Sequence, residues 1–158
     1  MQLFIMRHGD ASMTVSPDAN RPLTQQGKLE AKLMGKWLQG LNTTIDQVLV
    51  SPYVRAQQTS SEVLSQLDCK PIITTTELIT PSGDASQVHD YIDGVIDSTH
   101  CQTLLMVTHM PLVSYLVETL TFDKQAPIFQ TSGIAEIDYD SKAMKGQLVR
   151  LISPVDLC

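Results

Sequence analysis

The chain alternates short apolar runs with longer segments in which apolar residues recur at helical spacing. Leu3 to Met6 is an uninterrupted apolar run, and Val48 to Val50 and Leu104 to Thr108 are two more runs of this kind. Such runs are typical of parallel strands that helices cover on both faces. Ile72 to Thr74 is shorter and is predicted to form an edge strand.

Between these runs, apolar residues at intervals of three and four predict amphipathic helices. The first helix follows Thr24, whose hydroxyl is a suitable N-cap, and is expected to end near Gly40. The second is expected to begin at Ser51 and Pro52, because an N-cap followed by proline is a typical helix start. It is expected to run to about Leu67.

Two further helices and a pair of strands complete the pattern. Apolar positions from Val88 to Ile96 mark one helix, and another is expected from Pro111 to Leu120. Residues 134–139 and 147–152 are predicted to form an antiparallel hairpin. Strands and helices alternate without a repeat or linker, so the expected fold is α/β. We expect a single domain over residues 1–158, with a mostly parallel central sheet and helices on both faces.

Composition excludes several classes of protein. The net charge of −6 argues against nucleic acid as a partner. No apolar stretch is long enough to span a bilayer and no signal peptide is visible, so no membrane association is expected. The three cysteines, Cys69, Cys101 and Cys158, show no CxxC spacing, which argues against a disulfide framework or a zinc site. A reducing cytoplasm is the expected compartment.

Residues capable of phosphate chemistry follow three of the predicted strands. Arg7 and His8 follow the first, Arg55 lies shortly after the second, and His109 follows the strand that ends at Thr108. Carboxyl ends of parallel strands meet at one edge of a sheet, where α/β proteins bind ligands. Guanidinium groups bind oxyanions through two hydrogen bonds, and imidazole can act as a nucleophile or base. The sequence therefore predicts a phosphate site at this edge.

Taken alone, each of these residues has an ordinary explanation. An arginine after a strand is most often a surface charge, and a histidine there most often caps the strand. The phosphate hypothesis prevails because the ordinary explanations require several independent coincidences at strand ends. His89 and His100 lie outside this set and are expected at the surface. No HxH or HExxH spacing occurs, so no metal site is expected.

Four segments together resemble the histidine phosphatase superfamily, which is phosphoglycerate mutase-like. They are Arg7-His8-Gly9, Arg21-Pro22-Leu23-Thr24-x-x-Gly27, Ser51-Pro52-x-x-Arg55-Ala56-x-x-Thr59 and Thr108-His109-x-Pro111. The short chain and the forms RHGDA and RPLT are most similar to bacterial phosphohistidine phosphatases of the SixA type. The resemblance implies that His8 is the nucleophile that becomes phosphorylated. Arg7, Arg55 and His109 would hold the phosphoryl oxygens. Arg21 would add a contact, and no metal or cofactor is needed.

The expected charge states follow from the chemistry of phosphoryl transfer, which is mainly positioning and charge stabilisation. His8 must be neutral to attack, and its far ring nitrogen is expected to donate to a backbone carbonyl. His109 is expected to be protonated and to stabilise charge. Asp10 either orients or adjusts the residues of the site, or it caps a loop.

The chain departs from larger members of this superfamily at the general acid. Thr80 stands where those relatives carry a carboxylic acid, and Glu77 and Asp84 are nearby alternatives, although Asp84 could equally cap a helix. A phosphoramidate needs less protonation of its leaving group than an alkyl phosphate ester. Residues 83–104 have room for one helix, so we expect a minimal form without a cap insertion.

The expected activity is removal of phosphate from a histidine-containing phosphotransfer domain of a sensor kinase in a bacterial signalling relay. The reaction would proceed through a phosphohistidine intermediate at His8. One alternative is a small-molecule phosphomonoesterase of the same superfamily, which would prefer sugar phosphates to phosphohistidine. Another is a non-catalytic phosphate-binding module, which would bind a relay protein without turnover.

Overall fold

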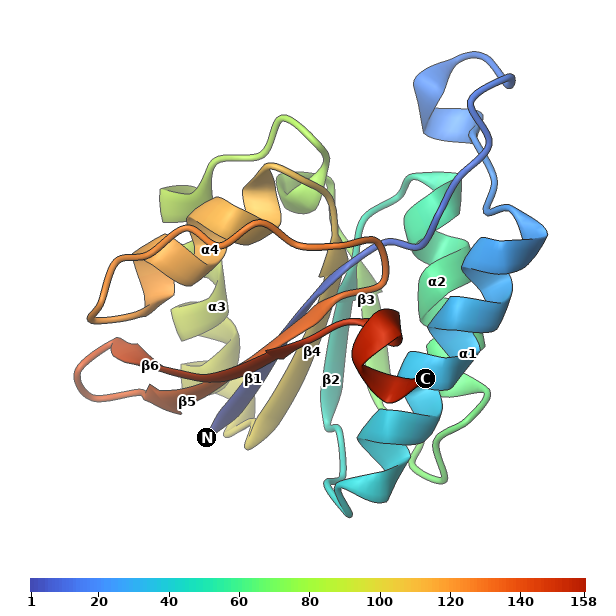
Figure 1. Ribbon diagram of the computed structural model, residues 1–158. Helices are drawn as coiled ribbons and strands as arrows, with labels where there is room; N and C mark the ends of the chain where they lie inside the picture. Colours follow the sequence, from blue (N-terminus) through green and yellow to red (C-terminus); the bar gives the residue numbers. More distant parts are fainter.

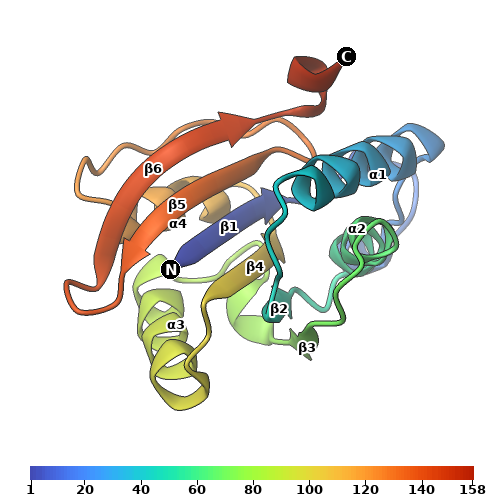
Figure 2. The same ribbon diagram turned by 90° about the horizontal axis from the view of Figure 1, so that it is seen from below.

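A six-stranded mixed sheet separates two layers of helices (Figures 1 and 2). The computed structural model describes residues 1–158. The strands are β1 (Gln2–Arg7), β2 (Gln47–Val50), β3 (Ile72–Thr75), β4 (Thr103–Thr108), β5 (Ile134–Asp140) and β6 (Lys145–Ile152). Their order is β3-β2-β4-β1-β5-β6, in which the first four are parallel and β5 is antiparallel to both of its neighbours. The mostly parallel sheet, the edge strand and the terminal hairpin are confirmed.

Two helices cover each face of the sheet. α1 (Gln25–Gly40) packs with α2 (Val54–Leu64) on one side, and α3 (Ala85–Thr99) packs with α4 (Leu112–Leu120) on the other (Figure 1). The short 3-10 helices are η1 (Asp18–Asn20), η2 (Glu77–Ile79) and η3 (Pro154–Leu157). The expected α/β class is confirmed. None of the helices combines the length and apolar character needed to cross a membrane.

The start of α2 corrects the sequence prediction. The helix was expected to begin at Ser51 and Pro52, but it begins one residue after Tyr53, whose backbone is extended. The Ser51 hydroxyl accepts the Tyr53 N–H at 3.2 Å, so it turns the chain before the helix instead of capping it. The helix ends at Leu64, before the expected Leu67, because the chain enters a turn there.

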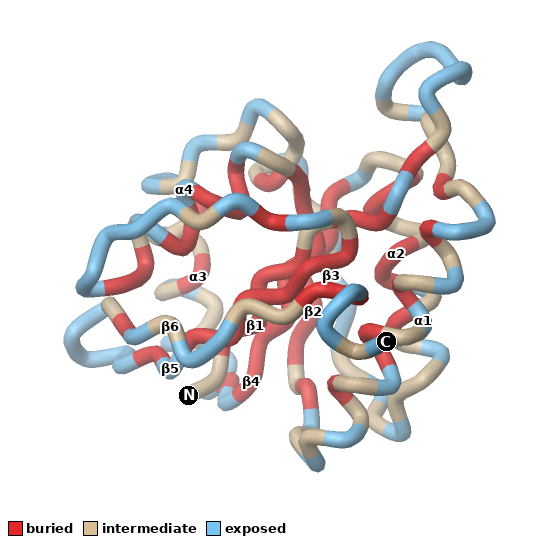
Figure 3. Tube along the Cα trace, viewed as in Figure 1, coloured by how far each residue is buried: buried red, intermediate tan, exposed pale blue.

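Alternation along the strands divides the apolar core between the two faces. In β1, Leu3 and Ile5 pack on the side of α3 and α4, whereas Phe4 and Met6 pack on the side of α1 and α2. Successive side chains of a strand point to opposite faces, so a strand covered on both sides must be apolar throughout. This requirement explains the uninterrupted runs in β1 and β4, which lie in the buried centre of Figure 3.

The sheet has a topological switch point between β1 and β4. These strands are parallel neighbours, and Arg7 at the end of β1 is paired with Thr108 at the end of β4. The chain continues from β1 to α1 on one face and from β4 to α4 on the other. Such a point is where open α/β sheets bind ligands. The next residues, His8 and His109, are therefore brought together at this position.

Candidate active site

Side chains from three strand ends converge at the switch point. The ring centroids of His8 and His109 are 5.1 Å apart. Arg55 reaches back from the first turn of α2, and its Nε lies 3.3 Å from His8 Nε2. All three side chains are buried. The convergence that the sequence predicted for these residues is confirmed as geometry.

His8 is held as a neutral imidazole in one tautomer. Its Nδ1 lies 2.7 Å from the carbonyl oxygen of Gly9, which can only accept, so Nδ1 carries the proton. His8 Nε2 therefore carries a lone pair, and Arg55 Nε donates to it. Burial, and to a smaller degree the nearby arginines, lowers the pKa of His8 to about 4. The expected neutral state and the expected carbonyl partner are both confirmed.

Arg55 is fixed by contacts on either side. Its guanidinium carbon lies 5.0 Å from the centroid of the Tyr53 ring. One turn along α2, the Thr59 hydroxyl donates to the Arg55 carbonyl at 2.7 Å and accepts the Gly9 N–H at 2.9 Å. Thr59 therefore ties α2 to the turn after β1. Thr59 belongs to one of the four sequence segments, but no sequence pattern indicated this bridging contact.

The residues before β5 bind the end of β1. Arg7 Nη1 donates to the carbonyl of Phe129 at 2.7 Å, and the Ser132 N–H donates to the carbonyl of His8 at 3.1 Å. Ser132 is fully buried with a φ of 62°, and its hydroxyl has no hydrogen-bond partner. Arg7 Nε is also buried without a partner. Left-handed backbone and unpaired buried groups concentrate at functional sites. No signal in the sequence marked Ser132.

The protonated state of His109 was expected for the reaction itself, and in the structure the ring is neutral. Burial lowers its pKa to about 3, and His8 and Arg55 act in the same direction, so His109 is neutral. His109 Nε2 lies 2.7 Å from Ser51 Oγ, which already accepts the Tyr53 N–H. The Ser51 hydroxyl can donate its proton to His109 Nε2, and in that arrangement the ring proton lies on Nδ1. Because Nδ1 is buried without a partner, His109 offers a neutral N–H donor.

Asp18 joins two arginines at the rim of the site. Its Oδ2 lies 3.1 Å from Arg55 Nη2, and its Oδ1 lies 2.8 Å from Arg21 Nη1. The hydrogen bonds from Arg21 and Arg55 lower the pKa of the Asp18 carboxyl. Arg21 also donates to the carbonyl of Ser12 at 2.6 Å. Through Asp18 and Arg55, Arg21 is linked to His8. The sequence motifs indicated Arg21 as a site residue. They did not indicate Asp18, because a carboxylate in a loop belongs to no periodic pattern or motif.

The carboxyl groups suggested by the sequence make other contacts than with the two histidines. Asp84 Oδ1 accepts a backbone N–H in the first turn of α3, which makes it a helix cap. Glu77 is exposed in η2, and Thr80 follows that helix. Asp10 Oδ2 accepts the hydroxyl of Thr24 at 2.8 Å, which is the loop-capping role. None of these carboxylates is hydrogen-bonded to the imidazoles of the site.

The remaining histidines lie outside the site. His100 ends α3 and is exposed, as expected. His89 was expected at the surface, but it is largely buried: its Nε2 lies 3.0 Å from Tyr139 Oη and 3.3 Å from Asp93 Oδ2. The expectation was wrong because Tyr139 reaches His89 from β5, far along the chain.

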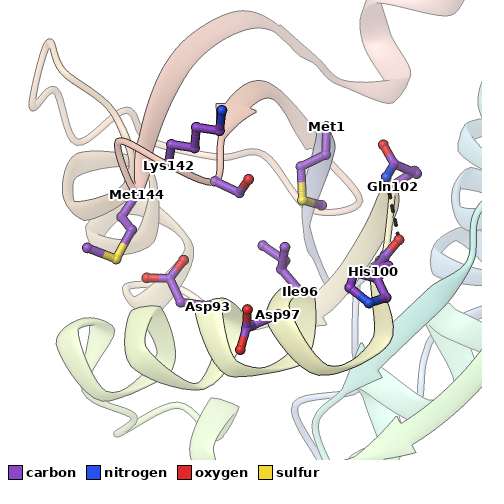
Figure 4. Close-up of a pocket in the computed structure, with 10 residues that line it drawn as sticks. Met1, Asp93, Ile96, Asp97, His100, Gln102, Lys142 and Met144 are labelled. Atoms are coloured by element: carbon purple, nitrogen blue, oxygen red, sulfur yellow. Dashed lines mark hydrogen bonds between the residues drawn. The ribbon is translucent and has the colours of Figure 1, made fainter.

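A pocket of about 440 Å³ lies next to this second histidine cluster (Figure 4). Its lining includes Met1, Asp93, Asp97 and Lys142, so it combines carboxylates with a single lysine. His100 also lines it, but no arginine does, in contrast to the switch point. No three His, Cys, Asp or Glu side chains of the protein are grouped so that they could hold a metal ion.

Comparison with known proteins relates the site at the switch point to a family. A model of the histidine phosphatase superfamily (branch 1) matches residues 3–80. Phosphohistidine phosphatase SixA of Escherichia coli (strain K12) is 39% identical over 160 residues, which cover 99% of this chain and 96% of the relative. The chain belongs to the histidine phosphatase superfamily. The resemblance drawn from the four segments is confirmed, and the protein is a hydrolase of this superfamily.

Further relatives and solved structures extend the match to this superfamily. A SixA homolog from Haemophilus influenzae is 39% identical over 163 residues, 98% of each chain. The solved structure of the protein histidine phosphatase SixA complexed with tungstate covers 100% of both chains, with a TM-score of 0.95 and 39% identity. The alpha-ribazole phosphatase of Shigella flexneri, at 20% identity, has a TM-score of 0.75, covers 98% of this chain and 97% of its own, and shares the fold alone.

Proposed function

We propose that this protein is a phosphohistidine phosphatase that acts on a histidine-containing phosphotransfer domain of a sensor kinase. The observation that carries the proposal is a neutral His8 whose Nε2 lone pair lies next to Arg55 and the His109 ring. Such a nucleophile among guanidinium groups is suited to accept a phosphoryl group. The similarity to SixA proteins over nearly the whole chain supports the same substrate class. The proposed setting is the cytoplasm, which three free cysteines support.

In the first step, the lone pair of His8 Nε2 attacks the phosphorus of the substrate phosphohistidine. The P–N bond of the substrate breaks, and its electron pair stays on the leaving imidazole, which takes up a proton from solvent. In the second step, a water oxygen attacks the phosphorus on His8, and the bond to Nε2 breaks. One proton of that water stays on the released phosphate and the other returns to solvent, so His8 becomes neutral again.

Arg7, Arg55 and His109 are the proposed contacts of the phosphoryl oxygens. Guanidinium groups stabilise the charge that spreads over the three equatorial oxygens in the transition state. His109 contributes its Nδ1–H, and a phosphoryl dianion beside this ring raises its pKa because an anion favours the charged form of imidazole. Protonation of His109 thus follows phosphoryl binding instead of preceding it. Arg21 is proposed as an outer contact.

Two features favour phosphohistidine over a phosphate ester. No carboxylate is hydrogen-bonded to either imidazole of the site, and an alkoxide leaves poorly unless it is protonated. A labile P–N bond with an imidazole leaving group requires less assistance. In addition, the segment between η2 and β4 forms the single helix α3, so no inserted domain covers the site. A histidine on the surface of another protein can therefore reach His8.

The direct test uses a phosphotransfer domain labelled on its histidine with radioactive phosphate. The wild-type protein is expected to release the label, and His8→Ala is expected to be at least a thousandfold slower, about the effect of removing a nucleophile. His100→Asn alters an exposed histidine and serves as the matched control with wild-type rates. Faster turnover of sugar phosphates would indicate a small-molecule phosphomonoesterase. Binding of the labelled domain without turnover would indicate a binding module.

A further inference from the structure

Asp18 accepts hydrogen bonds from the two terminal nitrogens of Arg55, which would otherwise be available to a phosphoryl group. Arg55 Nη2 donates to the Asp18 carboxylate at 3.1 Å, and Arg55 Nη1 donates to the Asp18 carbonyl at 2.8 Å. The second oxygen of the carboxylate accepts from Arg21 at 2.8 Å. One carboxylate therefore binds both of these arginines, and only the Nε edge of Arg55 faces His8.

The contrast in exposure shows which partner can move. The side chain of Arg55 is 5% exposed and is held within α2, whereas that of Asp18 is 54% exposed. Asp18 lies in η1, within the segment 12–20 that projects beyond the carboxyl edge of the sheet (Figure 1). Most residues of this segment are exposed (Figure 3), and its base is closed by the Ala11–Leu23 bridge. No residue of η1 is buried, so displacement of Asp18 would uncover no core side chain.

A phosphoryl dianion next to His8 would compete with this carboxylate. Both are anions that accept two hydrogen bonds from a guanidinium group, and two anions sharing one guanidinium repel each other. The side-chain hydrogen bonds of Asp18 go to Arg55 and Arg21, and none goes to His8 or His109. Its position offers a way to discriminate against free phosphate, because the carboxylate already accepts from Arg55 and Arg21.

We propose that Asp18 is a specificity-determining residue, an internal anion that competes with phosphoryl groups for Arg55 and Arg21. A free phosphate or small phosphate ester has to displace Asp18 with its own binding energy alone. A phosphorylated protein also contacts the exposed segment 12–20 and displaces Asp18 as it docks. The inference rests on the proposed function, because it assigns to the same site a preference for phosphate carried by a protein.

The test is equilibrium binding of tungstate, a tetrahedral oxyanion, to the wild-type protein, Asp18→Asn and Asp18→Ala. Both variants are expected to bind tungstate about tenfold more tightly, since the apparent affinity rises as the competent fraction of sites increases. Asp68→Asn makes the same change in net charge at an exposed site that contacts neither arginine, and it is expected to bind like the wild type. Unchanged melting temperatures would show that all variants are folded.

Hydrolysis provides the second readout. With p-nitrophenyl phosphate, KM is expected to fall about tenfold in Asp18→Asn while kcat changes little, because only binding competition is removed. With a phosphorylated phosphotransfer domain, KM is expected to change less. Tungstate affinity that stays the same or weakens in both Asp18 variants would overturn the inference and make Asp18 a support for Arg55. Tungstate binding requires no turnover, so a protein that failed to hydrolyse phosphohistidine would still test Asp18.

Discussion

The protein contains two histidine clusters, one buried and one partly buried, and they differ in how completely their polar groups are paired. At the carboxyl edge of the sheet, Arg7 Nε, His109 Nδ1 and the Ser132 hydroxyl are buried without partners. In the second cluster, Tyr139 donates to Asp93 and the ring of His89 bonds both Tyr139 and the Met144 carbonyl. Buried polar groups without a partner cost free energy, so their concentration at one edge of the sheet marks where a ligand is expected.

The two clusters also differ in charge. His8 and His109 are neutral imidazoles surrounded by arginines, and burial lowers the pKa of both. In the second cluster a carboxylate accompanies the histidine, and burial together with Asp93 raises the pKa of Tyr139. A cationic environment with unprotonated nitrogen suits an incoming anion, whereas the carboxylate of Asp93 in the second cluster would repel one. The second cluster is therefore interpreted as structural.

The largest expected effect on activity comes from replacing the guanidinium group of Arg55. Arg55→Lys keeps the charge but loses the planar pair of donors, so kcat/KM with the phosphorylated domain is expected to fall by about 10² to 10³. Arg150→Lys is the matched control, because Arg150 lies on β6 and pairs with Glu136 at 2.9 Å, away from the site. Steady-state kinetics distinguishes the two variants. Equal losses in both would mean that the switch point is not the active site.

A second prediction concerns the pH dependence of stability. The pKa of His8 is about 4 in the folded protein and near 6.5 in the unfolded chain, so the unfolded chain binds more protons between these values. The contribution to stability is present above about pH 6.5 and is lost as pH falls toward 4. Between pH 7 and 5, His8 is expected to account for about 2 kcal/mol of lost stability. Urea unfolding of His8→Asn should show a correspondingly weaker pH dependence, and the exposed control His100→Asn should not.

A smaller effect is expected at Ser51. Ser51→Ala removes the partner that places the proton of His109 on Nδ1, and loss of a partner that orients an imidazole typically costs about tenfold or more in activity. Ser114→Ala is the control, because it also deletes one buried hydroxyl, which donates to the Pro127 carbonyl. Both variants should be less stable by about 1 kcal/mol. An unchanged kcat/KM in Ser51→Ala would remove the proposed role of the His109 tautomer.

The smallest effect on activity is expected in the second cluster. His89→Gln breaks the contacts with Tyr139 and the Met144 carbonyl and should lower stability by about 1 kcal/mol. The rate with the phosphorylated domain should remain within about twofold of wild type, since surface and structural changes away from a site leave the chemistry intact. Thermal unfolding and kinetics measured on the same preparation check both statements. A large loss of kcat at unchanged stability would contradict the structural interpretation.

Much of the fold could be predicted because each strand and helix follows a local pattern. The apolar runs of β1 and β4 reflect burial on both faces, and the Thr24 hydroxyl caps α1 as its position suggested. The start of α2 could not be predicted in the same way. Ser51 satisfies the local rule for an N-cap, but its hydroxyl is hydrogen-bonded to His109, which follows β4. A local sequence rule cannot predict a contact between residues so far apart in the chain.

The site could be predicted as far as strand ends determine it. His8, Arg55 and His109 lie at or near the carboxyl ends of parallel strands, so topology alone brings them together. The charge of His109 could not be predicted, because its pKa depends on burial and on neighbours that only the folded structure provides. Asp18 was missed for a related reason: its significance comes from Arg55, which only the folded structure brings beside it.

The most direct test of the central claim is to trap the phosphorylated protein and locate the phosphoryl group. The wild type is mixed with a phosphorylated phosphotransfer domain, quenched within milliseconds in alkaline denaturant, and analysed by peptide mass spectrometry and phosphorus NMR. Because Gly9 holds the proton on Nδ1, the account predicts phosphate on His8 and on its Nε2 atom. Turnover with phosphate on Nδ1, on another residue, or on no residue at any quench time would contradict it.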